Sequence, residues 1–175
     1  MTQVSVPFST HKISEDCEIS SDTAIGYPGF GIQRDKTTGI PFQIPHNGTV
    51  RIGKGCRIGS YVCIDRGTVE DTIIGDNVMI DNLVHIGHNA KIGEGTIIVA
   101  HTVVGGSATI GKNCFIGEGA LIKQHITIGD QAIVAMGSVV IRDVPSKDIV
   151  AGNPAKSIKD KCNLSKEDRF RMVGY

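Results

Sequence analysis

The chain lacks tryptophan, an excess of charge of either sign and any long apolar run. Its 18 Lys and Arg residues balance 18 Asp and Glu residues, so net charge gives no electrostatic reason to expect nucleic acid or an anionic membrane as a partner. No apolar segment approaches the length of a membrane span. The first residues also lack the basic region followed by an apolar run that is typical of a signal peptide. We therefore expect no membrane insertion.

The five cysteines include no CxxC pair, which argues against a zinc or redox motif. Cys17, Cys56 and Cys114 each follow a recurring isoleucine by four residues, at a position that otherwise holds valine, alanine, threonine or serine. We expect these three thiols to be small residues of the core. Cysteine usage of this kind favours a reducing, cytoplasmic compartment.

What the sequence does contain is an aliphatic residue at every sixth position. No amphipathic helix has this period, and it is typical of a hexapeptide β-helix, in which each hexad forms one short strand and one corner. Shorter pieces of the same ladder start at Ile13 and at Ile52. The unbroken part runs through twelve hexads, at Ile74, Ile80, Ile86, Ile92, Ile98, Val104, Ile110, Ile116, Ile122, Ile128, Val134 and Val140.

Three hexads close an 18-residue triangular coil, so we predict an all-β, parallel β-helix of about six coils. Residues 1–144 are expected to form this domain, with loop insertions at about residues 28–48 and 65–71 that leave near the same corner in successive coils. Residues 145–175 are expected to form a C-terminal cap and a short helix that starts at a capping-box-like Ser165. Loops on a repeat scaffold usually lie on its binding side.

The 18-residue coil brings two histidines to one corner. His88 and His125 both lie where the third face meets the first, two coils apart, which is roughly 10 Å along the axis. The coil between them presents Gly105, Gly106 and Ser107. An imidazole there can act as a general base, and the Gly106 N–H can stabilise an oxyanion. From position alone, surface histidines without a role are an equally good interpretation.

The other four histidines are placed by the same repeat. His85 is close enough to that corner to line the site, whereas His101 falls on another face. His11 and His46 fall in loops. We expect His11, His46 and His101 to have structural or loop roles.

Two strings carry a family resemblance: IDRGTVEDTIIG at 64–75 and IDNLVHIGHN at 80–89. They resemble the UDP-3-O-acylglucosamine N-acyltransferases of lipid A synthesis, as do GFG at 29–31 and IPHNG at 44–48. The resemblance covers about residues 25–130. It implies a left-handed parallel β-helix and a homotrimer with sites between subunits.

The resemblance also implies roles for individual residues. His88 falls on the catalytic base of the family and His125 on its second histidine. Gly106 corresponds to a glycine whose N–H suits the oxyanion. Asn82 matches the asparagine of the IDN string and is expected to bind substrate. Asn89 or Asn82 would orient His88 or the acceptor.

The donor and the acceptor are expected at opposite parts of the chain. Phe30 and Arg34, in the 28–48 loop, are available to contact a base or phosphate of the acceptor. The separate N-terminal uridine-binding domain of the family and its helical extension for acyl carrier protein have no match. The tail at 143–159 instead resembles CoA-dependent sugar acetyltransferases, which favours acetyl-CoA or another acyl-CoA as donor. CoA contacts are expected from Gly105 and Ser107 and, in the tail, from Gly152, Asn153, Pro154 and Lys156. A plain cap is the alternative role of the four tail residues.

These observations predict an acyltransferase that moves an acyl group, expected to be acetyl, from CoA to the amine of an amino sugar or nucleotide-linked amino sugar, without a metal. The pathway would be lipopolysaccharide or surface-polysaccharide synthesis. Alternatives are sugar O-acetylation, long-chain transfer from acyl carrier protein, and a β-helix that only assembles. A γ-class carbonic anhydrase needs an H-x4-H zinc motif, but Gly93 and Asp130 stand five residues after His88 and His125.

Overall fold

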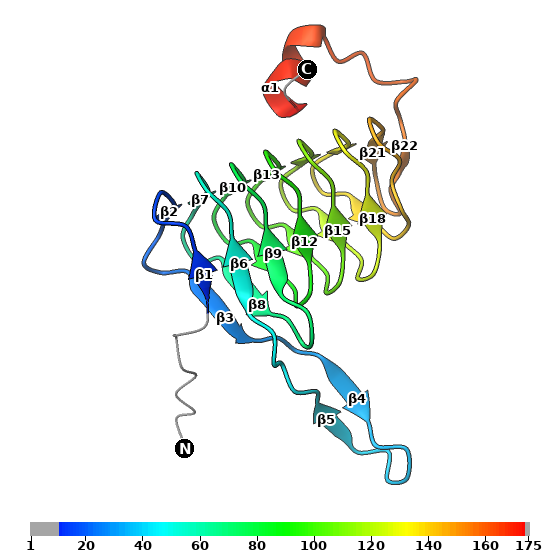
Figure 1. The fold of residues 1–175 in the computed structure, drawn as a ribbon. Helices are drawn as coiled ribbons and strands as arrows, with labels where there is room; N and C mark the ends of the chain where they lie inside the picture. Colours follow the sequence, from blue (N-terminus) through cyan, green and yellow to red (C-terminus); the bar gives the residue numbers. More distant parts are fainter. Residues whose placement is uncertain (1–10, 174–175) are drawn as a thin grey trace.

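The computed structural model describes residues 11–173, whose strands wind into a three-sided prism (Figure 1). Face A contains β1 (Lys12–Ile13), β6 (Val50–Ile52), β9 (Thr72–Ile74), β12 (Lys91–Ile92), β15 (Thr109–Ile110) and β18 (Thr127–Ile128). Face B contains β2 (Glu18–Ile19), β7 (Arg57–Ile58), β10 (Met79–Ile80), β13 (Ile97–Ile98), β16 (Phe115–Ile116), β19 (Ile133–Val134), β21 (Ile149–Ala151) and β22 (Lys156–Ser157). Face C contains β3 (Ala24–Pro28), β8 (Cys63–Arg66), β11 (His85–Ile86), β14 (Val103–Val104), β17 (Leu121–Ile122) and β20 (Val139–Val140).

Adjacent coils pair in the register that the period predicts. Ile80 lies opposite Ile98 on face B, and Ile86 lies opposite Val104 on face C. Both pairs are parallel, and each partner is 18 residues further along the chain. The prediction of a parallel β-helix of about six coils is therefore confirmed.

The aliphatic ladder forms the core. Ile86, Ile98 and Ile116 are completely buried, and the small position four residues after a rung is buried too, as at Cys114. Threonine is accepted at that position because its hydroxyl reaches the backbone: Thr96 Oγ1 donates to the Gly111 carbonyl at 2.7 Å. The first rung differs, since Ile13 is 40 % exposed. It lies in the first described coil, so no further coil among the described residues packs below it.

The two insertions leave face C from neighbouring strands. Ile25 in β3 pairs with Ile64 in β8, so the two insertions follow equivalent rungs of successive coils. Within that insertion, β4 (Ile32–Arg34) and β5 (Pro41–Gln43) form an antiparallel hairpin. Figure 1 shows this hairpin projecting well away from the prism.

The C-terminal segment closes the other end of the prism. After β21 the chain turns back in the antiparallel strand β22 and then reaches α1 (Lys166–Val173). The predicted N-terminal capping of α1 is present, because Ser165 Oγ accepts a hydrogen bond from the Asp168 N–H at 3.0 Å. Within residues 11–173, no helix combines the length and apolarity that crossing a bilayer requires.

Candidate active site

The corner between faces C and A stacks equivalent residues from successive coils. His88, Gly106 and Gln124 each stand two residues after a buried rung. The backbones of these turns are linked, since the Ser107 N–H donates to the His88 carbonyl at 2.8 Å and the His125 N–H to the Gly106 carbonyl at 3.1 Å. The structure therefore brings together the histidines and the glycine that the period placed at one corner.

Gly106 lies directly against the ring of His88. A Cβ built on Gly106 would stand 2.8 Å from Cε1 and 2.9 Å from Nε2 of His88, closer than real Cβ contacts. Only glycine lets the imidazole occupy this space. The backbone of Gly106 and the edge of His88 consequently form one continuous surface.

The Gly106 N–H has no hydrogen-bond partner among the described residues. At some other corners an Asn or Asp side chain in the coil above accepts from the equivalent N–H: Asn82 does so for Ser60 at 2.7 Å, and Asp130 for Lys112 at 2.8 Å. Above Gly106 stands Gln124, and none of the described residues accepts a hydrogen bond from the Gly106 N–H. A fixed, unpaired N–H beside an imidazole is the arrangement that stabilises a developing oxyanion.

His88 is half-buried in an environment rich in imidazoles. Its ring packs edge-to-face against His46, with centroids 5.2 Å apart and an interplanar angle of 89°. Burial lowers the pKa of His88 below its usual 6.5, the neighbouring His46 lowers it further, and Asp65 opposes both. His88 therefore stays neutral near pH 7, as a general base must.

Asp65, in β8, is the carboxylate of this site. It is only 9 % exposed, and its Oδ2 lies 3.5 Å from Nε2 of His85. Burial raises the pKa of Asp65, while His85, His88 and His46 lower it by a smaller amount. His85 thus lines the site, as its sequence position suggested.

The GFG segment closes the site from the side of the hairpin. A Cβ on Gly29 would stand 2.4 Å from Oδ2 of Asp65, and a Cβ on Gly31 would stand 3.3 Å from Cε1 of His46. Phe30 between them is 86 % exposed. The extended backbone therefore turns its two glycines toward the acidic and imidazole side chains and its phenyl ring outward.

Asn89 holds the second insertion against this corner. Its Oδ1 accepts from the Thr68 N–H at 2.7 Å, and its Nδ2 donates to Thr68 Oγ1 at 2.8 Å. The expected role of Asn89 was to orient His88 or the acceptor; the structure instead pairs its amide with the 65–71 loop. A hollow of about 410 Å³ lies beside it, lined by Val69, Glu70, Asn89, Lys91, Ser107 and Thr109.

The remaining expected substrate and donor residues lie elsewhere in the chain. Asn82 stands at the corner between faces B and C, where it binds Ser60. Arg34 is on the hairpin and donates through Nη1 to the Gly39 carbonyl at 3.0 Å. Four tail residues are exposed at the C-terminal end of the prism: Gly152, Asn153, Pro154 and Lys156. Within residues 11–173, no group of three His, Cys, Asp or Glu side chains is arranged to hold a metal ion.

Sequence reasoning missed two residues of the site, His46 and Asp65. His46 was expected to be an ordinary loop residue, yet only 7 % of it is exposed. Asp65 stood inside the IDRG string and was given no role. Each residue is part of a string that resembles the acyltransferase family, IPHNG for His46 and IDRG for Asp65. Membership of these strings was the sequence feature that could have indicated a role in the site.

A parallel β-helix of hexad coils with a histidine at one corner defines the class of hexapeptide-repeat proteins. Residues 71–106 and 107–142 match the family model described as "Bacterial transferase hexapeptide (six repeats)", and residues 49–82 match "Hexapeptide repeat of succinyl-transferase". The chain belongs to these hexapeptide-repeat transferases.

Its relatives confirm the resemblance seen in the sequence. The UDP-3-O-acylglucosamine N-acyltransferase of Rickettsia akari is 45 % identical over 148 residues, which are 85 % of this chain and 42 % of the relative. UDP-3-O-acylglucosamine N-acyltransferase 2 of Legionella pneumophila is 49 % identical over 148 residues, 85 % of this chain and 43 % of the relative. The chain thus spans less than half the length of these two relatives.

Solved structures share the fold. The Arabidopsis UDP-N-acetylglucosamine acyltransferase superposes with a TM-score of 0.70 at 24 % identity, over 92 % of this chain and 60 % of that one. LpxA from Bacteroides fragilis, a UDP-N-acetylglucosamine acyltransferase, gives 0.68 at 23 % identity, over 93 % and 68 %. The β-helix of this chain is therefore of the LpxA type.

Proposed function

We propose that the chain transfers an acyl group from a thioester to the amine of an amino sugar, with His88 as general base. The observation that carries this proposal is the pairing of His88 with the unpaired N–H of Gly106. The two groups lie against each other, as base and oxyanion donor must in acyl transfer. The names of the curated relatives, which are amine acyltransferases, agree with this reaction class.

In the proposed mechanism the neutral imidazole of His88 takes a proton from the acceptor nitrogen as that nitrogen attacks the thioester carbonyl. The N–C bond forms and the carbonyl oxygen becomes negative, facing the Gly106 N–H. The C–S bond then breaks, and the thiolate leaves and receives the proton from His88. His125 is proposed to assist near the thioester, because it stands one coil above Gly106 and interacts electrostatically with His88.

The donor is proposed to lie along face C. Outward side chains on this face form an apolar column that rises from His85 through Val103, Leu121 and Val139. The column ends at Gly152, whose carbonyl accepts from the Val139 N–H at 2.9 Å. From His88 to this end is three coil spacings, roughly 14 Å. An extended thioester such as acyl-CoA can follow this path, with Gly105 and Ser107 near the acyl group and the Gly152–Lys156 segment near the far end.

Association of three copies would complete the site. On face B, Met79 is 45 % exposed, and on face C Leu121 is 45 % exposed, whereas face A presents Lys91 and Thr127 to solvent. A partner that covers faces B and C would bury this apolar surface. Asn82, at the corner between faces B and C of one copy, would then lie near His88 of the next copy. This arrangement would let Asn82 bind substrate at that site, as expected, although the two residues are at different corners of one chain.

The experiment measures acyl transfer for every pair of donor and acceptor, with acyl-CoAs and acyl-acyl carrier proteins of graded chain length as donors and nucleotide-linked amino sugars as acceptors. Transfer should fall by about 10²–10⁴-fold in His88→Ala, whereas Lys112→Ala, at an exposed position on the corner between faces A and B, serves as the control. Near-normal turnover by His88→Ala with the preferred pair would overturn the mechanism. Competition between the two donor types separates transfer from CoA from long-chain transfer by acyl carrier protein.

A further inference from the structure

His46 carries a buried nitrogen that the proposed mechanism does not use. Its Nδ1 lies 2.8 Å from the Ile44 carbonyl, and because a carbonyl oxygen can only accept, Nδ1 must hold the proton. Nε2 of the neutral ring is then a lone-pair acceptor. This atom is buried, and no described residue donates to it. A buried acceptor without a donor is costly, so a ligand group that donates to it beside His88 would bind favourably.

Asp65 offers a second acceptor in the same place. Its buried carboxylate has the imidazole of His85 at 3.5 Å, longer than the roughly 2.7–2.9 Å of a close charged hydrogen bond. Asp65 interacts electrostatically with His46, His85 and His88, so the carboxylate and the rings form one cluster. The geometry leaves the carboxylate able to accept a stronger donor than His85.

The walls of this cluster are backbone. A Cβ on Gly29 would collide with Asp65 at 2.4 Å, and a Cβ on Gly31 would collide with Ile44 at 2.9 Å and press on His46 at 3.3 Å. The backbone of the GFG segment therefore borders this cluster. The acceptors of the cluster are Asp65 Oδ, His46 Nε2 and the free nitrogen of His88, so a ligand group that supplies only N–H donors matches them best.

We propose that Asp65 and His46 form the subsite for the acceptor's amino group, which binds as an ammonium, and that this subsite selects an amine over a hydroxyl. An ammonium presents three donors and no acceptor and carries a charge opposite to that of Asp65. A hydroxyl presents one donor and no charge. The inference rests on the proposed function and decides between N- and O-acylation within it.

The proton count is consistent with that function. The ammonium loses one proton to solvent and becomes the free amine with a lone pair. His88 takes a second proton as the nitrogen attacks the thioester. As a carboxylate, Asp65 holds the amine in place and favours the imidazolium that forms.

The test measures binding, which needs no turnover. Dissociation constants are determined by titration calorimetry for UDP-sugars with an amine at C2, C3 or C4 and for their hydroxyl counterparts. We expect the wild-type protein to bind at least one amine about tenfold or more tightly than its hydroxyl counterpart. Asp65→Asn, which keeps the shape and removes the charge, should bring that ratio close to one.

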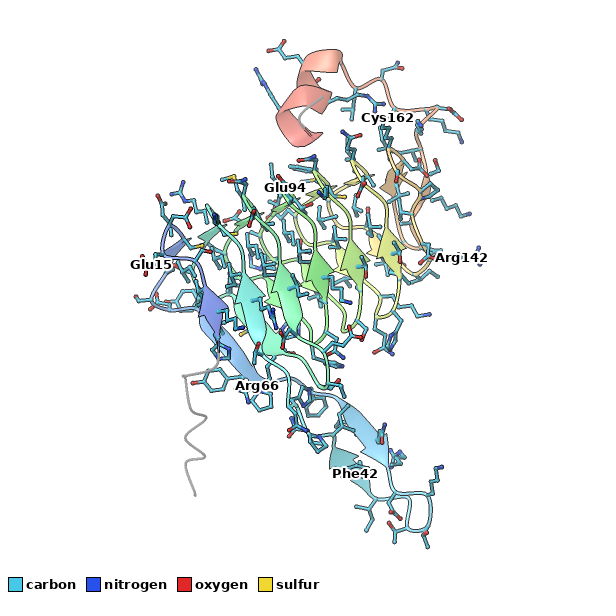
Figure 2. The ribbon with its side chains drawn as sticks, in the orientation of Figure 1. Glu15, Phe42, Arg66, Glu94, Arg142 and Cys162 are labelled. Atoms are coloured by element: carbon cyan, nitrogen blue, oxygen red, sulfur yellow. The ribbon has the colours of Figure 1, made fainter. Side chains whose placement is uncertain are left out.

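Variants of His46 separate the two ring nitrogens. His46→Asn can keep the hydrogen bond to the Ile44 carbonyl but loses the acceptor at Nε2, so the amine preference should fall several-fold. His46→Gln can place an amide oxygen near the Nε2 position and should retain most of it. Glu94→Gln is the control, an exposed carboxylate that Figure 2 labels on the opposite side of the prism from Arg66, which adjoins Asp65.

The outcomes separate the subsite from the proposed function. An amine preference that persists in both Asp65→Asn and His46→Asn, or its absence from the wild-type protein for every pair of sugars, overturns the subsite. Amine acceptors that still turn over in the wild type would leave the acyltransferase proposal standing in that case. Conversely, a lost preference in Asp65→Asn together with full turnover by His88→Ala would support the subsite and overturn the catalytic role of His88.

Discussion

The rings of His46 and His88 pack perpendicular to each other, with centroids 5.2 Å apart, although they belong to an insertion and to a regular coil. The contact ties the return segment of the projecting hairpin to the corner that holds Gly106. It also shapes the chemistry of the base, because burial is the first cause and His46 the second cause of the lowered pKa of His88.

This relationship predicts the pH dependence of turnover. His88 works as the neutral imidazole, so activity is present above its pKa and lost as pH falls through it. The acid limb of kcat/KM should therefore have its midpoint below 6.5, the ordinary histidine value. In His46→Asn the midpoint should move upward toward that value. The measurement is a pH–rate profile, supported by NMR titration of His88, and a wild-type midpoint above 6.5 would contradict the environment described.

A single methyl group at Gly106 should disable the site. In Gly106→Ala the new Cβ would meet the His88 ring at under 3.0 Å, which forces the imidazole away from the N–H that serves the oxyanion. We expect kcat to fall by about 10²-fold or more, with little change in Tm because the corner is at the surface. Lys112→Ala, at the equivalent position of another corner, is the control. Normal kcat in Gly106→Ala would show that the pairing of base and N–H is not required.

The hexad period predicts those parts of the site that belong to regular coils. Residues 18 apart must stack, so the shared corner of His88, Gly106 and His125 follows from counting alone. His46 could not be found in this way, because the path of the 28–48 insertion has no repeat register. The ring reaches His88 only through the fold of the hairpin and the close packing of Gly31.

Asn89 shows a different limit of sequence reasoning. Its place beside His88 was predictable, but its partner was not, because the amide turns to the insertion loop and bonds Thr68. An asparagine at a left-handed corner can direct its side chain toward either neighbour. The neighbour that it contacts depends on the path of the 65–71 loop. The sequence gives the length of this loop but does not give its path.

The Asn89 contacts predict a specific loss of loop order. Asn89→Ala removes two hydrogen bonds to Thr68, which should lower the free energy of unfolding by about 1–3 kcal/mol. Amide exchange at Thr68 should accelerate more than exchange in β12. Asn113→Ala is a matched control, because Asn113 has a similar φ of 51° against 59° for Asn89, and no hydrogen bond of its side chain to another described residue is seen. Equal destabilisation by the two variants would show that backbone strain, and not the loop contact, accounts for the effect.

The apolar columns on faces B and C predict self-association. If three copies bury these faces, placing a charge at Leu121 should separate them, because an unpaired carboxylate in an apolar interface is strongly unfavourable. Leu121→Glu should therefore sediment as a monomer at concentrations where the wild-type chain is a trimer.

Thr127→Glu introduces the same charge on face A, where the neighbouring strand presents Thr109 and the surface is polar. This variant should stay trimeric and active. Sedimentation velocity over a range of concentrations distinguishes the two variants. A monomeric wild-type chain with full activity would mean that one copy holds a complete site, and Asn82, at its separate corner, would then have no part in the reaction at His88.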